Sequence, residues 1–227
     1  MKTKDMNIKL FLIAAFGHLL CWAGGDLLLY FVPNGPLDTM QLWGYEKTAE
    51  MLEGANPIQF TVSGVVGTIA MMLALLGYYQ IYQFLKPVSK GAANVTLAGA
   101  LLTTIPGAVM HFTCTSMLWY FVKSGATKEA HDIMLAFFTE TMATTVMCNA
   151  GVMMVCIALL VTVAKGKTCL PKWACLVNTI PLTVVTGIAL AGIGAMNVGS
   201  ALMFFGLYFC VKKYGKAGEQ CAHTDFK

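Results

Sequence analysis

Apolar residues occur along this chain in long, nearly uninterrupted runs that are separated by short polar segments. A helix that crosses the hydrocarbon core of a bilayer needs about 20 mostly apolar residues. Six runs approach that length, namely Ile8–Val32, Ile58–Leu85, Ala92–Val122, Ile133–Ala164, Trp173–Met196 and Val198–Val211. The pattern predicts an all-α membrane bundle of six transmembrane helices. Only Asn197 separates the last two runs, which we interpret as a tight hairpin with a short final arm.

Composition supports lipid rather than water as the natural solvent. Of the 227 residues, 57% are hydrophobic and 11% are charged, and the mean hydropathy is +0.68, outside the range of soluble domains. We therefore treat residues 1–227 as one membrane domain whose main partner is the lipid bilayer. The lysines stand in small groups beside the apolar runs and form no basic stripe, so nucleic acid is not a predicted partner.

The lysines also predict an orientation. With the N-terminus in the cytoplasm, only Lys47, Lys123 and Lys128 of the fifteen lysines lie outside. This asymmetry follows the positive-inside rule, and an odd number of spans would abolish it. We expect a multi-pass protein of a bacterial plasma membrane with both termini cytoplasmic. The predicted cytoplasmic lysines are Lys2, Lys4, Lys9, Lys86, Lys90, Lys165, Lys167, Lys172, Lys212, Lys213, Lys216 and Lys227.

One connecting segment is long, the predicted external loop of residues 33–57. Within it, Asp38 and Gln41 have the spacing of a capping box for a short interfacial helix, which Gly54 would end. None of the eight cysteines falls in this loop. We interpret the cysteines as buried packing residues or, less often, ligands. Close helix packing is predicted by a stripe of small residues in the second run: Gly64, Gly67, Ala70, Ala74 and Gly77.

Four ionisable side chains fall inside the predicted spans, namely His18, Asp26, His111 and Glu140. A lone charge near the centre of a spanning helix costs about 2.5 to 3.5 kcal/mol even on an insertion scale. Each of these groups must therefore be neutral, paired or hydrated. His131, at the start of the fourth run, is interpreted instead as part of an exposed helix start.

Two of the four groups are predicted to meet. The third and fourth runs are joined by a turn at residues 124–127, and His111 and Glu140 are equally far from its centre. An antiparallel hairpin places both about 18 Å from the lysines that flank this turn. Cys114 and Thr144 lie within about one turn of them on the same predicted faces. We expect catalytic roles for His111, Glu140 and Asp26, and contacts to a substrate or ion from His18, Cys114 and Thr144.

This set of residues fits several functions. Imidazole and carboxylate groups suit acid–base chemistry, so the leading hypothesis is an intramembrane enzyme that acts on a lipid or an apolar small molecule. A divalent metal is a candidate cofactor, with Asp26, His111 and Glu140 as ligands, although no HExxH or paired-cysteine spacing supports it. A proton-coupled or ion-coupled transporter and a non-catalytic assembly or sensory partner remain alternatives, as does an oligomer. A buried pair that only joins two helices is the structural alternative.

The segment Gly25-Asp26-Leu27-Leu28-Leu29-Tyr30 lies in a first span that begins close to the N-terminus. It resembles the Gly-Asp-apolar-Leu signature of an uncharacterised bacterial family of six-span integral membrane proteins. The resemblance in size and span number covers most of the chain, whereas the motif covers only these residues. It implies the six-span fold and draws attention to Asp26, but it implies no substrate.

Overall fold

The computed structural model describes residues 7–190 and 192–224, with side chains through Gly215. Within this part of the chain, five helices are long and apolar enough to cross a membrane. The first is continuous from Lys9 to Tyr30 and combines three elements. These elements are α1 (Lys9–Leu20), the π-helical turn η2 (Cys21–Asp26) and α2 (Leu27–Tyr30). The others are α4 (Pro57–Leu85), α5 (Lys90–Lys123), α6 (Lys128–Ala164) and α8 (Ala195–Thr224).

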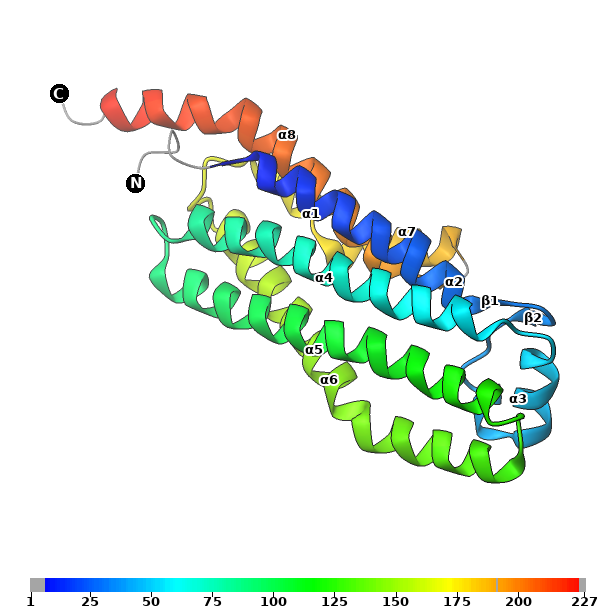
Figure 1. Ribbon diagram of the computed structural model, residues 1–227. Coiled ribbons are helices and arrows are strands. Elements are labelled where there is room, and N and C mark those ends of the chain that lie inside the picture. Colours follow the sequence, from blue (N-terminus) through cyan, green and yellow to red (C-terminus); the bar gives the residue numbers. More distant parts are fainter. Residues whose placement is uncertain (1–6, 191, 225–227) are drawn as a thin grey trace.

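The long helices form one bundle in which helices adjacent in sequence run antiparallel (Figure 1). Helix α4 packs between α1 and α5, α5 packs along α6, and α8 packs against α1. The start of α1 and the described end of α8 lie at the same end of the bundle (Figure 1). The predicted helical membrane bundle is thereby confirmed, and its first four spans coincide with the first four apolar runs.

The last two predicted spans differ from the structure. The fifth run contains a 3-10 turn, η4 (Lys172–Leu176), and the helix α7 (Thr179–Ala189) of only 11 residues. Such a helix is about 16 Å long, short of the roughly 30 Å hydrocarbon core. The chain reverses before α8, where Gly192 and Gly194 adopt φ values of +85° and +63°. Glycine readily adopts this left-handed conformation, which lets the chain turn soon after α7 ends. The helix is therefore shorter than the predicted fifth span, because the hydropathy pattern does not detect such turns.

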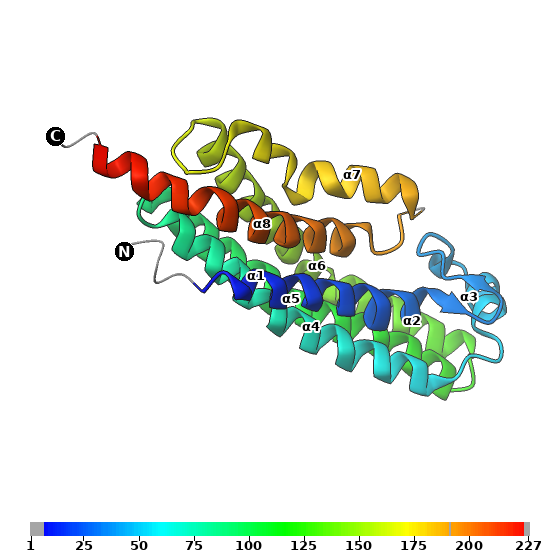
Figure 2. The same cartoon turned by 90° about the horizontal axis from the view of Figure 1, so that it is seen from above.

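Helices α7 and α8 therefore form a hairpin with unequal arms. Figure 2 shows that their connecting turn stops short of the end of the bundle where α3 (Tyr45–Leu52) lies. We call the end that α3 covers the capped end, and the opposite end, where α1 starts, the basic end. The turn between α7 and α8 thus lies beside the interior of the first spanning helix rather than beyond its end.

The small-residue stripe on α4 is confirmed as a packing surface. A methyl group added to Gly67 would lie 2.7 Å from Cγ of His111, and one added to Gly77 would lie 2.7 Å from Cε1 of Phe204. Because these distances are shorter than van der Waals contact, only glycine lets α5 and α8 approach α4 so closely.

The connecting segment of residues 33–57 contains a short helix, α3, but this helix begins at Tyr45 after the N-cap residue Gly44, so the prediction that Asp38 and Gln41 form the capping box at its start is wrong. Both carboxylate oxygens of Asp38 accept hydrogen bonds at 2.9 Å, one from the amide of Met40 and one from the side chain of Gln41. Gly54, at φ +74°, follows the end of α3 as expected. The segment also contains a two-residue hairpin of β1 (Phe31–Val32) and β2 (Gly35–Pro36) and a 3-10 turn, η3 (Gln41–Trp43).

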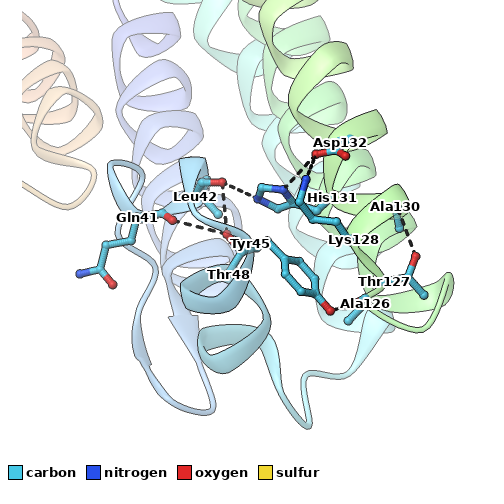
Figure 3. A network of polar contacts seen from close by, with 10 residues as sticks. All are labelled: Gln41, Leu42, Tyr45, Thr48, Ala126, Thr127, Lys128, Ala130, His131 and Asp132. Carbon is cyan, nitrogen blue, oxygen red and sulfur yellow. Dashed lines mark hydrogen bonds and ion pairs between the residues drawn. The ribbon is translucent and has the colours of Figure 1, made fainter.

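This segment is fastened to the turn between α5 and α6, as Figure 3 shows. Nε2 of His131 donates to the carbonyl oxygen of Leu42 at 2.9 Å, and the hydroxyl of Tyr45 donates to that of Ala126 at 3.2 Å. The interpretation of His131 as exposed is wrong, because its side chain is 2% exposed. The start of α6 is covered by the segment of residues 33–57, which no pattern local to residue 131 indicates.

Charges divide between the two ends of the bundle. At the capped end, the described acidic residues are Asp38, Glu46, Glu50, Glu53, Glu129 and Asp132, beside Lys47, Lys123 and Lys128. At the basic end, the described side chains include Lys9, Lys86, Lys90, Lys165, Lys167, Lys172, Lys212 and Lys213 and no acidic residue. The predicted asymmetry of the lysines thus corresponds to the two opposite ends of the bundle. Lys2, Lys4 and Lys227 lie outside the described residues, and Lys216 lies beyond the described side chains.

Candidate functional site

A π-helical turn in the first long helix brings two candidate ligand side chains to the same side of that helix. The turn covers Cys21–Asp26, and its closing hydrogen bond runs from the amide of Leu27 to the carbonyl of Trp22. Residues five apart, such as Cys21 and Asp26, lie about one turn apart in a π-helix, whereas an α-helix would place them about 140° apart. Both side chains are buried. The hydroxyl of Ser63 on α4 donates to the carbonyl of Gly25 at 2.7 Å and fastens this turn.

His111 on α5 completes a group of three donors. Its Nε2 lies 3.1 Å from Sγ of Cys21. One ligand atom each from Cys21, Asp26 and His111 lies within 4.8 Å of the other two, and all three residues are buried. Two helices therefore bring a thiol, a carboxylate and an imidazole together inside the bundle.

A chain of hydrogen bonds leads from this group into the bundle. The side-chain amide of Asn197 donates to Oδ2 of Asp26 at 2.8 Å, and its oxygen lies 2.9 Å from Nδ1 of His18. The hydroxyl of Tyr78 lies 3.1 Å from Nε2 of His18. Since the oxygen of Asn197 only accepts, His18 donates through Nδ1 and accepts at Nε2. A neutral His18 is thus satisfied at both ring nitrogens.

The turn between α7 and α8 covers the carboxylate of Asp26. A methyl group on Gly194 would lie 2.6 Å from Oδ2 of Asp26 and 3.2 Å from Nε1 of Trp22. That indole N–H is buried and has no hydrogen-bond partner among the described residues. An unpaired buried donor is costly. The site therefore holds a free N–H beside its carboxylate, which an acceptor atom of a ligand would satisfy.

Further sulfur atoms lie near the three donors. Met71 packs against Cys21, and a methyl group on Gly107 would lie 2.6 Å from Cε of Met71 and 3.1 Å from Sγ of Cys148. Cys114 is half-buried and does not belong to the group of three. Thiol and thioether sulfur are soft donors, so the surroundings favour a soft or borderline metal ion over magnesium or calcium.

The predicted pairing of His111 with Glu140 is wrong. Glu140 is exposed on α6, whereas His111 is buried against Cys21. Residues equally far from the turn do lie at the same depth, because the hydroxyl of Thr103 on α5 donates to the carbonyl of Cys148 on α6. Equal depth does not make two side chains face each other, since the direction of each is set by the rotation of its helix.

Glu140 and Thr144 on α6 both lie away from the three donors. Phe137, three residues before Glu140, lines an apolar cavity of about 520 Å³ between α4, α5 and α6 toward the capped end. Glu140 continues that face of α6 by helical spacing. Thr144 is half-buried and donates to the carbonyl of Thr141 within its own helix.

Comparison with known proteins gives a family without an assigned activity. Residues 1–214 match the model of a family described as "Family of unknown function (DUF6796)". The comparisons with curated proteins and with solved structures found no match. The match covers the three donors, the first four long helices and α8 as far as Tyr214. The chain therefore belongs to this family of unknown function, DUF6796.

Proposed function

We propose that this protein is an intramembrane metalloprotein that binds one divalent transition-metal ion through Cys21, Asp26 and His111. A single observation carries the proposal: ligand atoms from these three buried residues lie within 4.8 Å of one another. Thiolate, carboxylate and imidazole are the ligand types that zinc takes in proteins.

The spacing of the donors suits a tetrahedral ion. Around zinc, with bonds of about 2.0 to 2.3 Å, neighbouring ligand atoms lie roughly 3.3 to 3.8 Å apart. The distance of 3.1 Å between Cys21 and His111 is slightly shorter than this, and the limit of 4.8 Å for the group is longer. Small side-chain rotations therefore bring the three atoms onto one ion. Asn197 already holds the carboxylate of Asp26, as outer-shell partners of metal ligands commonly do.

Three protein ligands leave one coordination position of a tetrahedral ion open. This arrangement is typical of catalytic zinc sites, where a bound water or substrate takes the fourth position. We therefore favour an enzyme that acts on a lipid or a small apolar molecule. The indole N–H of Trp22, which has no partner among the described residues, lies beside the carboxylate of Asp26 and is suited to donate to an oxygen of such a substrate.

The proposed location is a bacterial plasma membrane with the basic end in the cytoplasm. Both termini and the open ends of the α7–α8 hairpin then face the cytoplasm, so that six membrane segments include one short helix, α7. The concentration of described lysines at the basic end supports this orientation. Asp26 lies about 6 Å from the outer end of α2 at Tyr30, which puts the site nearer the external face.

The hydrogen-bond chain supports a second candidate function, proton-coupled transport. Tyr78, His18, Asn197 and Asp26 are linked in sequence across α4, α1 and α8. Buried ionisable residues in such chains often relay protons through transporters. The two candidates differ on metal content, because the relay needs no ion and predicts proton flux that depends on Asp26 and His18.

Metal analysis of the purified protein tests the leading proposal. We expect about one zinc, or another first-row transition-metal ion, per chain in protein purified without chelator. Cys21→Ser, Asp26→Asn and His111→Ala should each lower this ratio at least tenfold, because loss of one of three ligands leaves too few to hold the ion. Inductively coupled plasma mass spectrometry measures the ratio.

Matched variants separate the site from the rest of the chain. Cys175→Ser and Asp132→Asn replace residues of the same types that lie outside the group. Both should keep the wild-type metal content. A wild-type ratio below about 0.1 after zinc is supplied, or equal loss in the matched variants, would contradict the metal centre.

A further inference from the structure

A second, smaller cavity lies at the basic end, far from the proposed metal centre. It has a volume of about 290 Å³ and lies between the start of α5 and the end of α6. Its lining combines two kinds of side chain. Lys165, Lys167 and Ser89 are polar, and Val95, Ile157 and Val161 are among the apolar members.

The polar part of the cavity carries uncompensated positive charge. Lys165 and Lys167 are exposed, and neither forms an ion pair with a described residue. The described acidic side chains all lie elsewhere, at the capped end or inside the spans. The lysines of this cavity are therefore free to bind an anion from outside the chain.

The start of α5 adds to the positive potential. Ser89 caps this helix by accepting a hydrogen bond from the amide of Ala92 at 3.3 Å. The dipole of a helix favours negative charge at its N-terminus. Lys90, the first residue of α5, adds a further positive charge near Ser89. The mouth of the cavity is thus suited to a phosphate group.

The apolar part of the cavity continues along the membrane-facing surface. Val95, Ile157 and Val161 are each between 42% and 51% exposed. Ile157 lies eight residues before Lys165 on α6, a distance of about 12 Å along the helix axis. Charged groups at the end of a spanning helix and apolar groups deeper along it match the boundary between headgroups and acyl chains.

We propose that this cavity binds one anionic phospholipid. Lys165 and Lys167 hold its phosphate, and one acyl chain lies along Val95, Ile157 and Val161. Basic pockets between spanning helices on the cytoplasmic side suit anionic lipids for this reason. The site is independent of the metal centre, because it involves none of the same residues.

Lipid binding to the full-length protein tests the proposal. Protein stripped of lipid in a neutral detergent is titrated with short-chain phosphatidylglycerol or phosphatidylcholine, and native mass spectrometry counts the bound molecules. We expect one phosphatidylglycerol per chain, bound at least tenfold more tightly than phosphatidylcholine. In the double variant Lys165→Ala with Lys167→Ala, the ratio of the affinities for phosphatidylglycerol and phosphatidylcholine should fall about tenfold. The reason is that each lysine near the surface adds attraction for an anionic lipid.

A matched variant and a second ligand make the result decisive. Lys212 and Lys213 lie at the same end on α8, outside the cavity. Their double alanine variant should keep the preference for phosphatidylglycerol. The variant Ile157→Trp should block the cavity and weaken the binding of both lipids. Equal binding of the two lipids by the wild type, an equal loss in the Lys212 and Lys213 variant, or displacement of the lipid by millimolar inorganic phosphate would overturn the proposal.

Discussion

Replacing Gly151 with alanine should lower the free energy of unfolding by about 2 kcal/mol. A methyl group at this position would lie 2.5 Å from Oγ1 of Thr103 and 2.6 Å from the carbonyl oxygen of Gly99, both on α5. The carbonyl belongs to the backbone and cannot rotate away, so α5 and α6 must separate. Overpacking of this kind costs about 1 to 3 kcal/mol or more, and it outweighs the gain of about 1 kcal/mol from the helix propensity of alanine.

Gly187→Ala is the matched control for this prediction. Among the described residues, a methyl group there would meet only Cβ of Ala195, at 3.8 Å, which is an ordinary contact. Gly187 also lies inside a helix, α7. This variant should be as stable as the wild type or slightly more stable. Unfolding in mixed detergent micelles measures both, and a Gly151→Ala protein as stable as Gly187→Ala would show that α5 and α6 do not pack through these glycines.

Replacing Asn197 with leucine should lower the free energy of unfolding by about 3 kcal/mol. Asn197 bridges Asp26 and His18 through its two side-chain groups. Leucine has a similar size, but it leaves Oδ2 of Asp26 without a donor and the Nδ1–H of His18 without an acceptor. Each unpaired buried group costs roughly 1 to 3 kcal/mol. The loss should appear as earlier unfolding in the same detergent titration.

Asn149→Leu is the matched control, because it replaces an asparagine that does not belong to the buried hydrogen-bond chain. Asn149 is exposed, and its side chain donates only to the carbonyl of Thr145 in its own helix. An apolar residue there faces lipid, so the variant should lose less than about 0.5 kcal/mol. If Asn197→Leu unfolds with the same midpoint as Asn149→Leu, the buried hydrogen-bond chain does not form.

Much of the fold follows from the sequence because lipid imposes a simple requirement. A spanning segment must be long, apolar and helical, and the first four runs meet this requirement in both the sequence and the structure. The α7–α8 hairpin does not follow, because its turn depends on the backbone conformation of Gly192 and Gly194. Glycine is common both in packed helices and in turns, so its presence alone did not identify this turn.

The candidate site could be predicted only in part. Ionisable residues inside spans stand out in the sequence because a charge within the membrane costs free energy. On this ground the sequence indicates Asp26, His111 and His18, and all three are buried. The sequence predicts a packing role for Cys21, because its closeness to Asp26 depends on a π-helical turn, whereas the spacing of an α-helix would place the two side chains on different sides. Asn197 joins the site only through the tertiary contact of α8 with α1.

The absorption spectrum of the cobalt(II) form tests the metal centre most directly, because it reports the bond to the sulfur of Cys21. Protein freed of metal and titrated with cobalt(II) should develop a thiolate-to-cobalt charge-transfer band in the near ultraviolet that saturates at one ion per chain. Cys21→Ser should lack this band, and Cys175→Ser should retain it. A wild-type spectrum without the band, or a band that persists in Cys21→Ser, would contradict a metal centre formed by Cys21, Asp26 and His111.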